Sequence, residues 1–197
     1  MARRPVAVYW GRFNPPHKGH LQVIRRFRRR YRLIVVVGSA ERSNTRRDPF
    51  SGRERKSMLE AYLRERRIRG ARVVTLNDGP SVTWALETLV RRHHPDVLLL
   101  SDEKSSLATR AAQRVRVVRF ARRGTVSSTR IRRAIARGDP SWSVLTGRSV
   151  VRLIERYHGI RRIRRAYGVP EPASPARRGR RGRGRKLREE PSSLCGS

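Results

Sequence analysis

Residues 6–20 read VAVYWGRFNPPHKGH, and this stretch decides the fold. The five apolar residues from Val6 to Trp10 are typical of a buried β-strand. Gly11 allows the chain to turn sharply after the strand, and two prolines stiffen the loop that follows. Apolar residues at helical spacing between His20 and Tyr31 then predict a helix. The stretch therefore predicts a strand–loop–helix unit, with the motif GRFNPPHKGH in its loop.

Outward from this unit, short apolar runs alternate with amphipathic stretches. Further strands are expected at residues 33–37, 72–76, 97–100 and 115–120. Further helices are expected at residues 51–68, where Ser51 and Glu54 fit a capping box, and at 82–94, 107–113, 129–137 and 149–157. Strands that alternate with helices indicate right-handed crossovers and a parallel sheet. We therefore expect an α/β fold, a Rossmann-like open parallel sheet of about five strands flanked by helices, with a small C-terminal helical part.

The length of 197 residues predicts one domain with at most a tail. Residues 1–168 are expected to form the domain, and residues 169–197 a disordered basic tail rich in Arg, Gly and Pro. No apolar run is long enough to span a membrane, and the N-terminus has no signal-peptide core. The single cysteine, Cys195, excludes a disulfide framework and a cysteine-based zinc site. These features predict a soluble, cytoplasmic protein.

The net charge is unusual. The chain has 49 Lys and Arg residues against 15 Asp and Glu, a formal charge of +34. All but four of these cations are arginines, the lysines being Lys18, Lys56, Lys104 and Lys186. A strongly basic protein attracts polyanions, so non-specific contact with RNA or DNA through the surface and the tail is one interpretation. The other interpretation is that most of these arginines form a solvated surface.

The loop motif carries residues that suit phosphate. In an open parallel sheet a ligand lies beyond the carboxyl ends of the strands, where this loop is placed. His17 and His20 are three residues apart and share one face of the first helical turn, whose N-terminus favours anions. Gly19 leaves room for a ligand, and Arg12 adds a positive charge. Two histidines without a third ligand are a poor zinc signature, so we interpret the motif as a phosphate site.

Two motifs together resemble the nucleotidylyltransferase superfamily. The loop GRFNPPHKGH resembles its HxGH motif, and residues 126–132, VSSTRIR, resemble its ISSTxIR motif. Members transfer a nucleotidyl group from a nucleoside triphosphate to a phosphate or similar acceptor and release pyrophosphate. Hydroxyls and amides at a helix N-terminus suit phosphates, and Arg132 offers a charge-assisted hydrogen bond.

A third set of residues narrows the resemblance to the archaeal-type nicotinamide-mononucleotide adenylyltransferases. It comprises GSAERS at 38–43, RDPF at 47–50, Glu54 and Arg55, and Trp84, and the likeness spans about residues 5–166. In that family a tryptophan on this helix stacks on the nicotinamide ring, which suits a cationic pyridinium. The chain departs from the family pattern at Ser81, where an asparagine is common, and at residues 101–103, where SDE replaces SGN.

The resemblance implies an enzyme of NAD biosynthesis and a role for each motif residue. The catalytic residues implied are His17, His20 and Arg132. The ATP-binding residues implied are Gly11, Arg12, Phe13, His17, Gly19, His20, Ser127, Ser128, Thr129 and Arg132. The acceptor-binding residues implied are Ser39, Arg47 and Trp84. Mg²⁺ is expected on the ATP phosphates rather than in a cage of protein ligands, and a homo-oligomer is expected.

Three alternatives stay open. Another member of the superfamily, with FMN, pantetheine phosphate or a similar acceptor, would keep both phosphate motifs. A basic nucleic-acid-binding protein on this fold would account for the charge. The amide and acid forms of the acceptor are not separated by these residues, nor is the role of the tail assigned.

Overall fold

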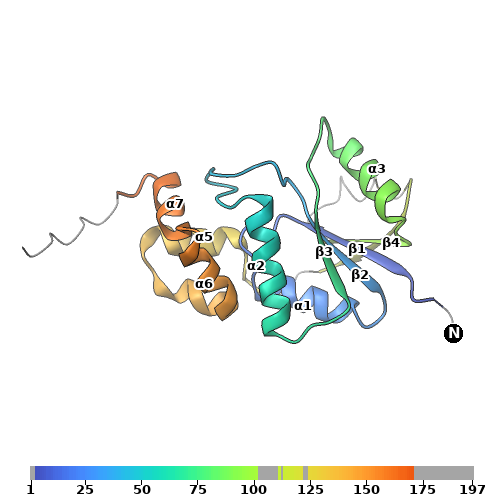
Figure 1. Ribbon diagram of the computed structural model, residues 1–197, viewed down its shortest axis with the longest axis horizontal. Helices are drawn as coiled ribbons and strands as arrows, with labels where there is room; N and C mark the ends of the chain where they lie inside the picture. Colours follow the sequence, from blue (N-terminus) through green and yellow to red (C-terminus); the bar gives the residue numbers. More distant parts are fainter. Residues whose placement is uncertain (1–2, 102–110, 112, 122–123, 171–197) are drawn as a thin grey trace, which may run out of the picture.

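The computed structural model describes residues 3–101, 111, 113–121 and 124–170 (Figure 1). Five parallel strands form one sheet in the order β3-β2-β1-β4-β5. They are β1 (Val6–Gly11), β2 (Arg32–Val37), β3 (Ala71–Thr75), β4 (Val97–Ser101) and β5 (Arg116–Phe120). The order reverses direction at β1, whose neighbours are β2 and β4, so the carboxyl ends of β1 and β4 form the switch point of the sheet. The predicted open parallel sheet is confirmed.

The helices lie close to their predicted positions. They are α1 (Lys18–Phe27), α2 (Gly52–Glu65), α3 (Val82–His93), α5 (Ser128–Arg137), α6 (Arg148–Arg156) and α7 (Gly159–Ala166), with a 3₁₀ helix, η2 (Pro140–Leu145). Helix α2 ends before the predicted Ile68 because Arg67 takes a left-handed φ of 51°. The predicted helix at 107–113 and the predicted tail at 169–197 lie largely outside the described residues.

Both faces of the sheet are covered, as the apolar strands require. Alternate residues of β1 serve the two faces: Ala7 and Tyr9 pack with α1 and α2, whereas Val8 and Trp10 pack with α3. All four side chains are buried. Because β1 is central and buried on both sides, the loop that follows it is held in a fixed place at the carboxyl edge.

The C-terminal helices lie beyond the carboxyl end of the sheet (Figure 1). They are joined to the β1–α1 loop by three hydrogen bonds to carbonyl oxygens of that loop. Thr146 Oγ1 donates to Pro16 O at 2.7 Å, Ser128 Oγ to Pro15 O at 2.9 Å, and Arg132 Nη1 to Asn14 O at 2.8 Å. The two sequence motifs therefore meet. Within the described residues, no helix combines the length and apolar character that crossing a bilayer requires.

Candidate active site

The two histidines of the loop motif lie against each other at the start of α1. Their rings stack with centroids 3.6 Å apart, and the centroid of the His20 ring lies 4.7 Å from that of Phe13 in an edge-on arrangement. The backbone N–H of His17 donates to His20 Nδ1 at 3.2 Å. Because Nδ1 accepts this bond, Nε2 is the His20 nitrogen that carries the proton of the neutral ring. Both side chains are buried, so the pair is held in one orientation.

Gly19 is required by this packing. A Cβ at Gly19 would lie 3.1 Å from both Cε1 and Nδ1 of His17. A larger residue would push the His17 ring away from its place at the helix N-terminus. The glycine predicted from the motif therefore shapes the histidine pair directly.

A cleft of about 420 Å³ opens between the β1–α1 loop and the start of α5, and we call it the central cleft. It is lined by Tyr9, Trp10, Gly11, Arg12, Phe13, Asn14, His17, His20, Arg47, Ser101, Ser127, Ser128, Thr129 and Arg132. This set contains every residue predicted for ATP except Gly19, together with Arg47 from the acceptor set. The structure thus brings together residues that are more than a hundred positions apart in the chain.

Arginines from different elements converge on the central cleft. Arg12 follows β1, Arg47 lies in the loop between β2 and α2, and Arg132 lies on α5. Burial lowers the pKa of Arg12, the charges of Arg47 and Arg132 lower it further, and Asp48 at 3.8 Å offsets this only in part. Cations that destabilise one another favour a bound anion. The electrostatics of the cleft therefore suit a chain of phosphates.

The hydroxyls of the second motif fix the start of α5. Ser127 is the N-cap, and its side chain accepts a hydrogen bond from Arg130 N at 3.1 Å. Thr129 Oγ1 accepts from Arg132 Nη2 at 3.2 Å, which holds the buried Arg132 side chain. The N-terminus of α5 consequently faces the cleft, where its dipole favours negative charge.

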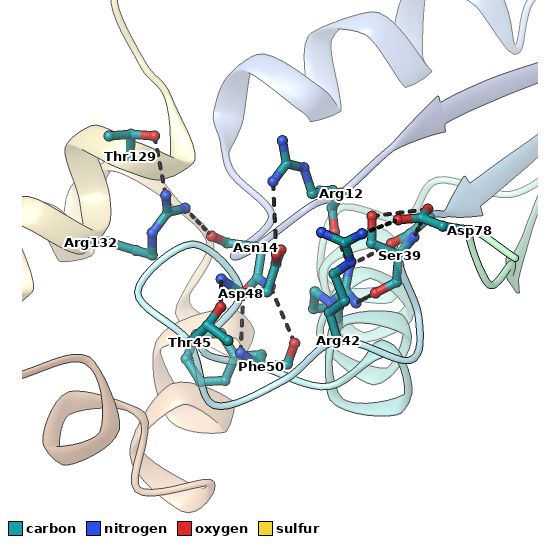
Figure 2. A network of polar contacts seen from close by, with 12 residues as sticks. Arg12, Asn14, Ser39, Arg42, Thr45, Asp48, Phe50, Asp78, Thr129 and Arg132 are labelled. Carbon is teal, nitrogen blue, oxygen red and sulfur yellow. Dashed lines mark hydrogen bonds and ion pairs between the residues drawn. The ribbon is translucent and has the colours of Figure 1, made fainter. Parts of the chain in front are cut away.

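The predicted acceptor residues are not all in the central cleft. Arg47 lines it, whereas Ser39 and Trp84 lie further along the carboxyl edge, after β2 and at the start of α3. Ser39 donates from both N and Oγ to Asp78 Oδ1, at 3.0 and 3.1 Å (Figure 2). Trp84 is 39% exposed, and its ring covers Gly79 so closely that a Cβ there would lie 2.0 Å from the ring.

Asn14 is a structural member of the site that the sequence did not single out. Its Nδ2 donates to Asp48 Oδ1 and to Phe50 O, both at 3.2 Å, and its Oδ1 accepts from Phe50 N at 3.3 Å (Figure 2). These bonds fasten the loop that carries Arg47 to the β1–α1 loop. Asparagine in a turn carries no periodic signal, so the pattern of the sequence could not reveal these partners.

Arg55 has a similar role at greater depth. Its side chain is fully buried and donates to four backbone carbonyls. Nη1 donates to Arg12 O and Gly38 O, both at 2.8 Å, Nη2 to Ser39 O at 2.7 Å, and Nε to Ser51 O at 3.2 Å. Arg55 therefore ties the carboxyl ends of β1 and β2 to α2. Burial lowers its pKa, although the charge of Asp48 counteracts this.

Ser101 ends β4 at the switch point, and the sequence motifs assigned it no role. It lines the central cleft and is 5% exposed. Its Oγ has no hydrogen-bond partner among the described residues. A buried hydroxyl without a partner costs about 1–3 kcal/mol, which a bound polar ligand would recover.

A second cavity, which we call the base cavity, adjoins the central cleft. Its volume is about 410 Å³, and it shares Tyr9, His17 and His20 with the cleft. Its other lining residues are Gly19, Gln22, Val23, Arg26, Phe27, Phe120, Ala121 and Val126. The lining is largely apolar and aromatic, in contrast to the cationic cleft. No group of three or more potential metal ligands occurs in the part of the chain that the structure describes.

Comparisons with known proteins give the family. Residues 8–134 match the cytidylyltransferase-like family. The nicotinamide-nucleotide adenylyltransferase of Pyrobaculum neutrophilum is 38% identical over 173 residues, covering 84% of this chain and 97% of that protein. The enzyme of the same name from Pyrobaculum arsenaticum is 37% identical over 172 residues, covering 84% of this chain and 96% of that protein.

A solved structure shows the same fold. It is a bifunctional NMN adenylyltransferase/ADP ribose pyrophosphatase from Francisella tularensis, complexed with AMP and a manganese ion, and its TM-score is 0.67 at 17% identity. The match covers 84% of this chain and 52% of that chain, so this chain spans about half the length of that protein. Together with the identities above, this confirms the resemblance predicted from the sequence: the chain belongs to the nicotinamide-nucleotide adenylyltransferases of the cytidylyltransferase-like family.

Proposed function

We propose that this protein transfers the adenylyl group of ATP to nicotinamide mononucleotide, forming NAD and pyrophosphate. The observation that supports this most is the convergence of Arg12, Arg47 and Arg132 on one cleft beside the histidine pair. A triphosphate and an acceptor phosphate are the anions that such a cleft would hold side by side. The names of the relatives point to the same acceptor.

We assign ATP to the two adjoining hollows. The apolar base cavity suits the adenine ring, and the cationic central cleft suits the triphosphate. The α-phosphate would then lie near Tyr9, His17 and His20, which line both hollows. Ser101 would offer its hydroxyl to the part of the ligand that crosses the switch point.

The reaction needs little from a general base. An oxygen of the acceptor phosphate attacks the α-phosphorus, a new P–O bond forms, and the bond from the α-phosphorus to the bridging oxygen breaks. The electron pair leaves on pyrophosphate. Because the attacking phosphate is already ionised, catalysis consists of positioning and of stabilising the spreading negative charge. His20 Nε2 would donate to an oxygen of the reacting phosphate, while Arg12 and Arg132 would neutralise the departing pyrophosphate.

Members of such families typically use a divalent metal, and we assign Mg²⁺ to this role. The central cleft offers guanidinium, imidazole and hydroxyl groups and no carboxylate among its described lining residues, so its donor set does not form a protein cage for the ion. Mg²⁺ typically keeps several waters and few protein ligands, and it would enter bound to the triphosphate. When bound there, it supplies charge neutralisation.

The acceptor is assigned to the carboxyl edge beside the central cleft. Arg47 would bind its phosphate, Ser39 lies next along the edge, and the exposed face of Trp84 would stack on the pyridinium ring. The homo-oligomer that the resemblance implies stays a prediction.

The proposal is tested by supplying ATP and Mg²⁺ with one acceptor at a time. Nicotinamide mononucleotide should give NAD, measured with a coupled dehydrogenase, whereas FMN and pantetheine phosphate should give no adenylylated product by chromatography. Product with one of the other acceptors and none with nicotinamide mononucleotide would assign another acceptor to the same chemistry.

The role of Trp84 has a separate expected result. Trp84→Ala should raise the KM for nicotinamide mononucleotide about tenfold, because a cation–π interaction of about 1–2 kcal/mol is removed, and it should leave the KM for ATP unchanged. Val82→Ala is the matched control, because Val82 is exposed on the same helical turn. Equal KM values for the acceptor in both variants would remove Trp84 from the acceptor site.

A further inference from the structure

Arginines gather at the edge of the sheet opposite to the central cleft. In a parallel sheet the carboxyl ends of the helices and the amino ends of the strands meet at one edge. Here Arg28 is the C-cap of α1, Arg91 and Arg92 lie in the last turn of α3, and β2 begins at Arg32. Cations near a helix carboxyl end stabilise that helix, which accounts for some of them. Their gathering around hollows of the surface needs a further explanation.

Three hollows follow one another on this side of the molecule. The first, of about 520 Å³, is lined by Arg25, Arg26, Arg28 and Arg29 of α1 and the turn after it. Arg28 Nη1 donates to Arg69 O at 3.4 Å, which joins the end of α1 to the loop before β3. Arg69 is followed by Gly70, which lines the second hollow.

The second and third hollows continue along the edge strand β3. The second, of about 390 Å³, has Arg32 and Arg72 on its walls. The third, of about 700 Å³, shares Arg72 and Ala71 with the second and adds Arg64, Arg92 and His93. We call the three together the arginine groove. It shares no lining residue with the central cleft, and it shares Arg26 with the base cavity.

The charges in the arginine groove are not balanced by carboxylates. Among the described residues that line it, Glu60 is the one carboxylate, and it is paired with Lys56 at 2.7 Å. Burial lowers the pKa of His93, and the nearby charges of Arg72 and Arg92 lower it further. Holding these cations close to one another is electrostatically unfavourable. Anions bound along the groove would offset this repulsion.

We propose that the arginine groove binds the phosphate backbone of a nucleic acid. The planar guanidinium donates two parallel hydrogen bonds to a phosphate, and a row of arginines matches a row of phosphates. The large exposed apolar residues of the described chain, Val82, Trp84, Val144 and Ile160, all lie outside the groove. An apolar protein partner would need such residues at the contact.

The test measures binding of a fluorescein-labelled 20-nucleotide uridine RNA to the full chain by fluorescence anisotropy across a range of KCl concentrations. Affinity should fall steeply with salt. In Arg32→Gln/Arg72→Gln/Arg92→Gln the affinity should fall by about tenfold or more. The slope of log Kd against log[KCl] should become shallower by about 2. Three arginines are removed, and each phosphate that is no longer neutralised accounts for about 0.7 of the slope. Thymidine DNA of the same length shows whether the 2′-hydroxyl is also recognised, and binding of either strand with this slope supports the proposal.

A matched control removes the same charge elsewhere. Arg152, Arg156 and Arg165 are exposed on α6 and α7 and line none of the three hollows. Arg152→Gln/Arg156→Gln/Arg165→Gln should change the RNA affinity less than about threefold. Equal reductions of affinity in the two triple variants would overturn the proposal, because the overall charge would then account for the binding. Equal competition by polyglutamate of the same charge would also overturn it. Thermal unfolding followed by circular dichroism checks that both variants are folded.

Discussion

His20→Ala is expected to lower kcat for NAD formation by about 10²–10³-fold, the loss found when one preorganised donor to a reacting oxyanion is removed. His20 is buried, its ring is fixed between His17 and Phe13, and its Nδ1 already accepts a backbone hydrogen bond. Nε2 is therefore the nitrogen of the neutral ring that carries the proton. Alanine cannot replace this donor, and a water in its place is not held in one orientation.

The measurement is steady-state kinetics with ATP and nicotinamide mononucleotide varied in turn. Because His20 is not one of the residues assigned to the acceptor, the KM for nicotinamide mononucleotide should stay within about threefold of its original value. His20→Gln keeps an N–H donor at a similar distance from the backbone and should lose less activity than His20→Ala. A His20→Ala protein that melts normally and keeps its kcat would show that the transferred phosphate does not lie against the histidine pair.

Arg55→Met is expected to lower the free energy of unfolding by about 3–5 kcal/mol, because it leaves buried polar groups without their partner. Methionine fills much of the same volume, so the loss comes from the carbonyls of Arg12, Gly38, Ser39 and Ser51. Three of these carbonyls belong to residues that follow β1 and β2 at the carboxyl edge. The loops of the site should therefore loosen together with the core.

Urea unfolding followed by circular dichroism measures this loss. Arg53→Met is the matched control, since Arg53 is exposed on the same helix, and it should change the free energy of unfolding by less than about 0.5 kcal/mol. The two variants differ only in the burial and the partners of the arginine removed. Equal stabilities would mean that water replaces the guanidinium in the core without a penalty.

The fold could be predicted from the sequence because its signals are local. Each strand is a short apolar run, and the loop motif and the second motif each lie within ten residues of the chain. Ile163 is the single large apolar residue that α7 buries, and it stands among arginines in GIRRIRRA, so this helix gave no clear apolar face. It was expected only as part of a C-terminal helical region.

The roles of the residues that support the site could not be predicted from the sequence, because their partners are distant in the chain. The resemblance includes Arg55 without giving it a role, and in a chain with 49 Lys and Arg residues no local signal marks it as the buried arginine of its helix. Its four acceptors lie on segments up to 43 positions away, and the partners of Asn14 lie 34 and 36 positions away. Only the folded chain brings these groups together. The carboxylate of Asp48 likewise lies 3.8 Å from the guanidinium of Arg12, which belongs to another loop.

The most direct test of the account follows the α-phosphorus itself. The protein is incubated with ATP labelled with ³²P at the α-phosphate, Mg²⁺ and nicotinamide mononucleotide, and the products are separated by thin-layer chromatography. The account predicts that the label appears in NAD and that unlabelled pyrophosphate is released in equal amount. Label found in AMP alone, with no NAD, would show that water rather than the acceptor phosphate attacks, and it would contradict adenylyl transfer in this cleft.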